Sequence, residues 1–159
     1  MSPTAQLVVF GLVSGAALLA AGSGLAAEPD TTADFSFHAV GAREALPALR
    51  ALAGVMDPEL VDLHTVRVTG NSEELALARA VVELIETAGP DAPRVATREG
   101  ADGSRIARVA VTQGTSRQAL GELRRLGVRK IAALDSAGIV LMRDSPKQVE
   151  VALEALRSF

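Results

Sequence analysis

Apolar residues recur along this chain at two different spacings, which predict helices and strands. In REALPALRALAG, which runs from Arg43 to Gly54, the leucines at positions 46, 49 and 52 lie on one face of a helix. In DFSFHAV, Phe35 and Phe37 alternate with polar residues, as in a half-buried strand. The pattern therefore predicts a strand followed by an amphipathic helix.

The second part of the chain repeats this order. RIARVAVTQ predicts a strand with Val109 and Val111 facing inward, and RQALGELRRLGV, which begins at Arg117, predicts a helix. VRKIAALDSAGIVLMRD predicts two strands around the turn DSAG. In the first part, VMDPELVDLHTVRVTG takes the equivalent place, but Pro58 stands where the second strand of that half would begin. We expect this strand to be short or to lie at a sheet edge.

The two parts align at an offset of 74 residues with no gap. At this offset, six residues of the first part align with identical residues of the second. They are Arg43, Ala45, Leu46, Leu49, Arg50 and Leu52, which align with Arg117, Ala119, Leu120, Leu123, Arg124 and Leu126. Agreement of strands, helices and caps at one offset indicates an internal repeat. We therefore expect an α/β (α+β) protein of two tandem modules, each with the order strand, helix, strand, strand, helix (βαββα).

Four expected helix starts carry capping residues. The pairs are Gly41 with Glu44, Asn71 with Glu74, Thr115 with Gln118 and Ser145 with Gln148. In the pairs that begin with Thr115 and Ser145, the hydroxyl would accept from an exposed amide, and the Gln three residues later would reach back to the cap. Gly41 and Asn71 are also acceptable cap residues. Pro146 would occupy a first helical position, where its missing N–H costs nothing. Two helices per module follow from these pairs.

Composition limits how such modules are held together. The 159 residues are 48% hydrophobic but only 3% aromatic, and there is no cysteine, Trp or Tyr. The core must therefore be aliphatic and without disulfides. The chain also lacks the aromatic platforms on which nucleic-acid bases stack, so nucleic acid is not an expected partner. Modules of half the usual domain size are expected to pack together or to oligomerise.

An uncharged apolar segment opens the chain. The first 27 residues contain no charged side chain, and small residues precede the sequence EPD, as at a signal-peptide cleavage site. We expect export to the periplasm or the extracellular space. The alternative is an uncleaved N-terminal membrane anchor, because the segment is long enough to cross a bilayer.

Composition also suggests the boundaries of the modules. AGPDAPRVATREGADGSR is rich in Pro, Gly and Asp and shows neither helical nor strand periodicity, which predicts a linker. The expected division is a signal peptide or anchor over 1–27, a leader over 28–34, a first module over 35–87, a linker over 88–105 and a second module over 106–159.

Two segments of the first module resemble a known family. FSFHAVGAREALPALRALAGVMDPELV resembles the opening of the short amino-terminal domain shared by secretins and TonB-dependent receptors, and VRVTGNSEELALARAVVELIE is similar to the small repeat modules of secretin periplasmic arms. The resemblance implies βαββα modules that dock proteins or form rings in the periplasm, without catalysis. No segment after the modules is suited to an outer-membrane barrel, plug or secretin core, so we expect a free-standing pair.

Candidate catalytic residues are few. His38 and His64 lie in or near expected strands, and Asp62 could share a face with His64. A metal site needs three or four converging ligands, and the second module contains no histidine. No serine stands in a G-x-S-x-G motif. We expect no enzyme activity, cofactor or metal; the alternative is a small envelope hydrolase or a metal-dependent enzyme that uses His38 and His64.

Charge is distributed unevenly between the two halves. Residues 28–88 hold four arginines against eleven acidic residues, a net charge of −7, whereas residues 89–159 hold twelve basic against eight acidic residues, a net charge of +4. Opposed charges favour association, within the chain, between copies of it or with an acidic partner. The expected protein-binding basic patch consists of Arg117, Arg124, Arg125, Arg129 and Lys130. We expect an envelope protein-interaction or assembly module that contacts membrane only through an uncleaved N-terminal segment.

Overall fold

The computed structural model describes residues 28–159, which form a mixed α+β fold, as expected from the sequence. The strands are β1 (Thr31–Ser36), β2 (Glu59–Leu60), β3 (Thr65–Gly70), β4 (Val95–Glu99), β5 (Arg105–Ala110), β6 (Lys130–Leu134) and β7 (Ile139–Asp144). The α-helices are α1 (Ala42–Ala48), α2 (Ser72–Glu86), α3 (Ser116–Arg125) and α4 (Pro146–Ala155). Shorter helical turns are the π-helical η1 (Leu49–Ala53) and the 3₁₀ turns η2 (Asp135–Ala137) and η3 (Leu156–Ser158).

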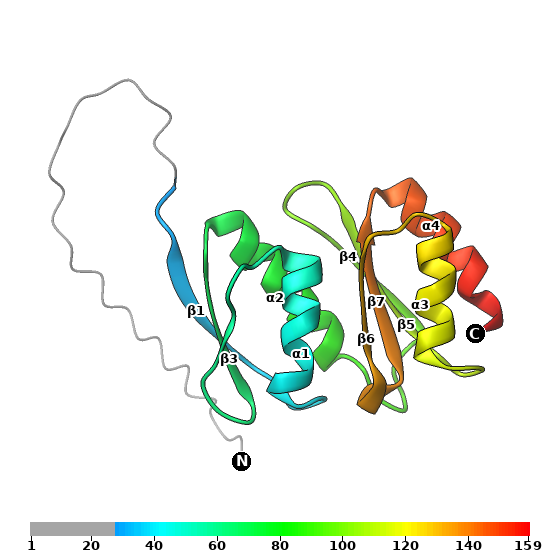
Figure 1. The fold of residues 1–159 in the computed structure, drawn as a ribbon, viewed down its shortest axis with the longest axis horizontal. Helices are drawn as coiled ribbons and strands as arrows, with labels where there is room; N and C mark the ends of the chain where they lie inside the picture. The colour runs from blue at the N-terminus through cyan, green and yellow to red at the C-terminus, as the bar shows by residue number, and fades with distance from the viewer. Residues whose placement is uncertain (1–27) are drawn as a thin grey trace, which may run out of the picture.

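Two antiparallel sheets and two pairs of helices are stacked in four layers (Figure 1). The first sheet has the strand order β1-β3-β2 and the second β4-β5-β7-β6. α1 and α2 lie between the sheets, and α3 and α4 cover the far face of the second sheet. Among residues 28–159, helices thus cover both faces of the second sheet and one face of the first.

Two apolar clusters fill the spaces between these layers. The larger surrounds α1, η1 and α2 and joins Phe37 and Val66 of the first half to Ile106, Leu134 and Leu141 of the second. The smaller lies between the second sheet and the helices α3 and α4. Because the larger cluster is shared, the two halves bury more apolar surface together than either could alone.

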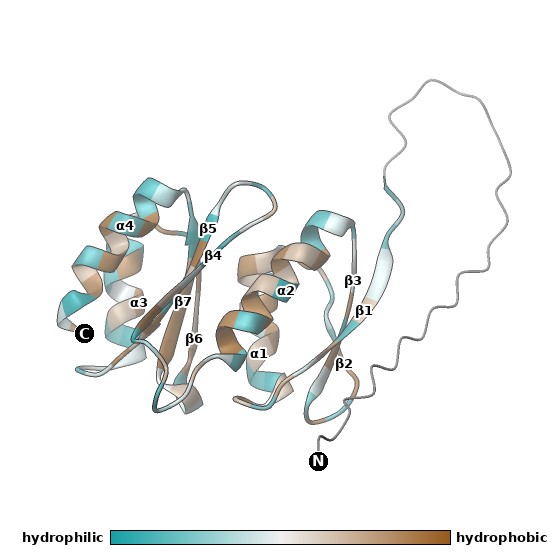
Figure 2. Cartoon of the chain, turned by 180° about the vertical axis from the view of Figure 1, so that it is seen from behind, coloured by the Kyte–Doolittle hydropathy of each residue, from teal (hydrophilic) through white to brown (hydrophobic). Residues whose placement is uncertain are grey.

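The layering explains two different burial patterns along the strands. In β3 buried residues such as Val66 and Val68 alternate with exposed ones, because the first sheet has one solvent face. In β7 every residue from Ile139 to Arg143 is buried, because helices cover both faces. Figure 2 shows β7 in brown and β1 in pale colours. On the solvent face of the first sheet, Arg67 donates to both carboxylate oxygens of Asp34, at 2.8 and 2.9 Å.

The two halves share strand register as well as element order. β1 pairs with β3 from Thr31 opposite Gly70, and β5 pairs with β7 from Arg105 opposite Asp144. Each residue of the second pair lies 74 positions after its counterpart in the first. α3 and α4 begin at the same offset from α1 and α2. The offset found in the sequence therefore relates equivalent positions of these elements.

The prediction that the halves align without a gap is wrong near the end of the first helix. Gly54 and Gly127 follow equivalent helices and both have a left-handed backbone, with φ of 76° and 84°, but they are 73 residues apart. The π-helical turn η1 accommodates the extra residue of the first half. The connection between the paired residues Leu60 and Val66 is one residue shorter than the connection between their counterparts Ala133 and Val140, which restores the offset of 74.

Two predicted boundaries are also corrected. Residues 95–99 of the predicted linker form β4, an edge strand whose side chains are mostly exposed, which explains the missing apolar periodicity. Residues 31–34 of the predicted leader belong to β1, which pairs with β3 along its length. The signal peptide or anchor predicted over 1–27 lies outside the described residues. Within 28–159, no helix combines the length and the apolar character needed to cross a membrane.

Most local predictions at β2 and at the helix starts are confirmed. β2 has two residues and lies at a sheet edge, as Pro58 predicted. Reciprocal capping boxes form in two pairs, Asn71 with Glu74 and Thr115 with Gln118. At α4 the side chain of Ser145 accepts from the N3 amide. Gly41 and Glu44 do not form a capping box, because Gly41 has no side chain that could accept a hydrogen bond. The Glu44 carboxylate accepts instead from the amide and hydroxyl of Ser136 in η2, at 3.0 and 2.5 Å.

Candidate functional site

The C-terminal end of α3 brings together three residues of the predicted basic patch. Gly127 reverses the chain after the helix and donates its N–H to the carbonyl of Arg124 at 3.0 Å. This reversal carries Arg129 and Lys130 back beside the helix end. Arg124 and Arg129 line a surface hollow of about 520 Å³, and Arg129 and Lys130 line a neighbouring hollow of about 310 Å³. We call Arg124, Arg129 and Lys130 the basic corner.

The other two residues of the predicted patch do not join the basic corner. Arg117 lies in the first turn of α3, about 10 Å along the helix from Arg124. Arg125 pairs with Glu122, with 2.5 Å between Nη2 and Oε1, and the hydrogen bond and the charge of that carboxylate raise the pKa of Arg125. Arg125 therefore contributes little net charge to this surface.

The basic corner has no acidic side chain within ion-pair distance in the part of the chain that the structure describes. Asp144 lines the same hollow as Arg129 and Lys130 but forms no ion pair with either within residues 28–159, and its carboxylate accepts from the amide of Ser145 at 2.7 Å. The negative charge of the first half does not pair with the basic corner either. Across residues 28–159 a single direct ion pair from α2 to the second sheet is present, Arg98 with Glu83 at 3.4 Å.

The two histidines lie near one end of the first sheet. The N–H of Phe37 donates to the carbonyl of His64 at 2.7 Å, so their backbones are neighbours. The His38 ring is 81% exposed, with Nδ1 3.3 Å from the Glu86 carboxylate, which also accepts from the backbone amide of His38 at 2.9 Å. Glu86 of α2 thus binds the segment that directly follows β1. Within residues 28–159, no group of three or more His, Asp or Glu side chains is placed to hold a metal ion.

Two buried arginines were missed by the sequence analysis. Arg108 in β5 is 1% exposed and Arg143 in β7 is 6% exposed. Arg143 donates from Nε to the hydroxyl of Ser104 at 2.9 Å, from Nη1 to the carbonyl of Leu52 at 2.5 Å, and from Nη2 to Asp102. Arg108 has apolar neighbours on both sides in β5, and Arg143 directly follows the apolar run from Ile139 to Met142 in β7. These apolar neighbours were the signal that could have revealed the two arginines.

The carboxylate beside Arg143 is strongly affected by its surroundings. Burial alone would raise the pKa of Asp102, but hydrogen bonds from Ser104 and Arg143 outweigh it and hold that pKa well below its usual range. These contacts join the turn between β4 and β5 to the end of η1. They therefore hold a turn of the second half against the end of a helix in the first half.

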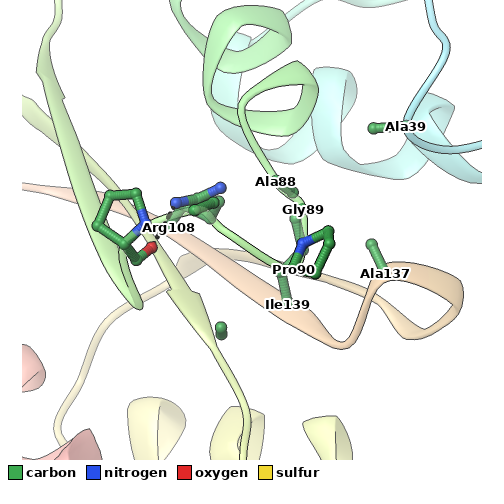
Figure 3. Close-up of a pocket in the computed structure, with 10 residues that line it drawn as sticks. Ala39, Ala88, Gly89, Pro90, Arg108, Ala137 and Ile139 are labelled. Atoms are coloured by element: carbon green, nitrogen blue, oxygen red, sulfur yellow. Dashed lines mark hydrogen bonds between the residues drawn. The ribbon is translucent and has the colours of Figure 1, made fainter.

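Arg108 lines a pocket between the two halves (Figure 3), and this pocket shares no lining residue with the hollows of the basic corner. The described residues thus contain two candidate sites, an open basic surface and a partly enclosed pocket with one guanidinium. Neither overlaps with the two histidines. No protein-family model matches the chain, and no curated protein matches it either.

Proposed function

We propose that the protein is an exported, non-catalytic adaptor that binds an acidic surface of another cell-envelope protein through Arg124, Arg129 and Lys130. The observation that carries this function is the basic corner, in which three cations line neighbouring hollows. In residues 28–159 none of them has an acidic partner within ion-pair distance. Complementary charge of this kind speeds association and selects the partner.

The element order supports a docking role in the envelope. β1, α1, β2, β3 and α2 follow one another in the first half, and β5, α3, β6, β7 and α4 in the second. Both have the βαββα order that the resemblance to secretin-arm modules implies. The uncharged apolar segment at residues 1–27 supports export to the periplasm or beyond, with a membrane anchor as the alternative.

A purely structural role of these cations predicts a different outcome. Arg124 at a helix C-terminus complements the helix dipole, and Lys130 at the start of an edge strand opposes edge-to-edge aggregation. On that view their replacement changes stability or solubility and leaves any partner bound. Arg129 belongs to neither category, because it lies between the helix and the strand.

Charge reversal of the basic corner separates the two views. The full chain is crosslinked in the envelope at low salt, and its partner is identified and purified. The triple variant Arg124→Glu, Arg129→Glu, Lys130→Glu should bind that partner at least about tenfold more weakly. Binding by the parent chain should weaken with added salt, as expected for exposed charges.

The matched control reverses three exposed arginines of the first half, Arg43, Arg50 and Arg79, which changes the net charge by the same amount. This control should bind the partner as the parent chain does. Equal binding by both triple variants, or recovery of the parent chain only as a monomer, contradicts the adaptor function. A partner that proves to be a second copy of the chain would show that the corner meets the acidic first half head to tail.

A further inference from the structure

A pocket of about 460 Å³ opens between the two halves at the C-terminal end of α2 (Figure 3). Its lining includes Ala39, Pro90, Pro93, Ala137 and Ile139, with Arg108 as the single charged side chain. The volume falls in the range of small-molecule sites. The other lining side chains are mostly small and apolar, so Arg108 is the one charged group that a guest would find among them.

Arg108 is held at this pocket by its position in β5. Ile106 and Arg108 point to the face of the second sheet that α2 covers, while Ala107 and Val109 point to the opposite cluster. The Arg108 side chain is 1% exposed, and its Nη2 donates to the carbonyl of Pro93 at 2.7 Å. Its Nε is buried and has no partner among the described residues. Burial lowers the pKa of this guanidinium.

The contrast with Arg143 shows what Arg108 lacks. Arg143 projects into the same layer from β7, and each of its three nitrogens has an acceptor, one of them the Asp102 carboxylate. In residues 28–159 no carboxylate lies within ion-pair distance of Arg108. A buried cation without a counter-ion is strongly unfavourable, so an incoming anion would relieve this cost.

We propose that this pocket binds the carboxylate of a small aliphatic acid, with the carboxylate on Arg108 and the aliphatic part against the alanine, proline and isoleucine walls. A guanidinium presents N–H groups in a planar fork that matches a carboxylate. A single negative charge fits better than a phosphate dianion, because no second charged side chain lines the pocket. This binding site is independent of the basic corner and of the adaptor function.

The same chemistry occurs in two sources, a free short-chain acid and the carboxyl terminus of a peptide with small apolar residues. Hexanoate represents the first, and acetyl-Ala-Ala with a free carboxylate represents the second. Hexanol and the peptide amide are their uncharged counterparts. Tighter binding of hexanoate identifies a free acid, and tighter binding of the dipeptide identifies a peptide end; both results support a carboxylate site.

Binding is measured on the ¹⁵N-labelled full chain through the Nε–H signal of Arg108. Millimolar hexanoate or dipeptide should shift this signal saturably, and the uncharged counterparts should not. Arg108→Met should weaken binding by about tenfold or more, because the hydrogen bonds to a charged group are lost. Binding to this variant is followed through the backbone amide signals of the pocket residues. Arg79→Met, at an exposed position of α2, removes the same charge and should bind like the parent chain.

A second variant tests the pocket without removing the cation. Ala137→Leu adds volume to the wall and should abolish binding while the Arg108 signal remains visible. The carboxylate site is overturned if neither acid gives a saturable shift, if Arg108→Met binds as tightly as the parent chain, or if sulfate binds as tightly as hexanoate. Because Met replaces an unpaired buried charge, the Arg108 variant is expected to fold.

Discussion

The guanidinium of Arg143 in β7 donates from Nη1 to the carbonyl oxygen of Leu52 in the π-helical turn η1, at 2.5 Å, across 91 residues of sequence. The last carbonyls of a helix have no partner within it, and here a side chain from the other half supplies one. The same guanidinium reaches Ser104 and Asp102 in the turn between β4 and β5. One side chain thus connects η1, this turn and β7.

Replacement of Arg143 should therefore destabilise the whole protein. Arg143→Met leaves the carbonyl of Leu52 without its side-chain donor and the carboxylate of Asp102 without its cationic partner, which we expect to lower the free energy of unfolding by about 2–4 kcal/mol. Urea unfolding measures the change. Arg105→Met is the control, because Arg105 makes only exposed ion pairs worth less than about 1 kcal/mol. Equal effects of the two variants would contradict this role of Arg143.

The Asp102 carboxylate should contribute stability that depends on pH. Its pKa is lower in the folded chain than the ordinary value of 3.8, so the unfolded chain binds the proton more readily. The contribution is fully present well above pH 3.8 and is lost as the pH falls below that value. The difference in free energy of unfolding between the parent chain and Asp102→Asn should be constant near neutral pH and shrink in acid. A difference that grows in acid would contradict the depressed pKa.

The π-helical turn should tolerate loss of one residue. Deletion of Arg50, which is exposed in η1, would give the first half the same helix length as the second and allow α-helical hydrogen bonding to Gly54. We expect a loss of less than about 2 kcal/mol in urea unfolding. Deletion of the exposed Gly121 in the middle of α3 rotates the following turn by about 100° and should disrupt folding. Similar losses of stability in the two deletion variants would contradict the interpretation that η1 accommodates the extra residue.

Neither half should fold by itself. The larger apolar cluster takes Ile106, Leu134 and Leu141 from the second half, and these side chains would be exposed in a chain of residues 88–159. We expect chains of residues 28–87 and 88–159 to show no cooperative thermal unfolding when separate, followed by circular dichroism. Mixing them should restore it. A cooperative transition in either separate chain would show that the shared cluster is not required.

Local features of this fold could be predicted from the sequence because they depend on neighbouring residues. Asn71 and Thr115 form capping boxes with residues three positions later, and Pro58 restricts β2 to a short edge strand. β4 could not be predicted, because an edge strand with exposed side chains carries no apolar period. The continuous apolar run that begins at Ile139 did contain evidence of a sheet covered on both faces.

The candidate sites were harder to predict, because they depend on distant segments. Arg124, Arg129 and Lys130 line neighbouring hollows because Gly127 reverses the chain after α3. Arg125, in contrast, pairs with Glu122 within its own helix. Arg108 occupies a position that would face solvent in an isolated second half. It is buried because α2 of the first half covers that face of the sheet.

The order of the four layers gives the stack a direction, with a sheet at one end and a helix pair at the other (Figure 1). The contact of the first half's helices with the second half's sheet is heterologous, and a contact of this type can in principle add units without limit. Within residues 28–159, the solvent face of the first sheet is polar and carries the Asp34–Arg67 pair, so it presents no apolar surface on which another pair of helices could pack. In this respect the first sheet is similar to the capping repeats of solenoid proteins, whose outer face is polar.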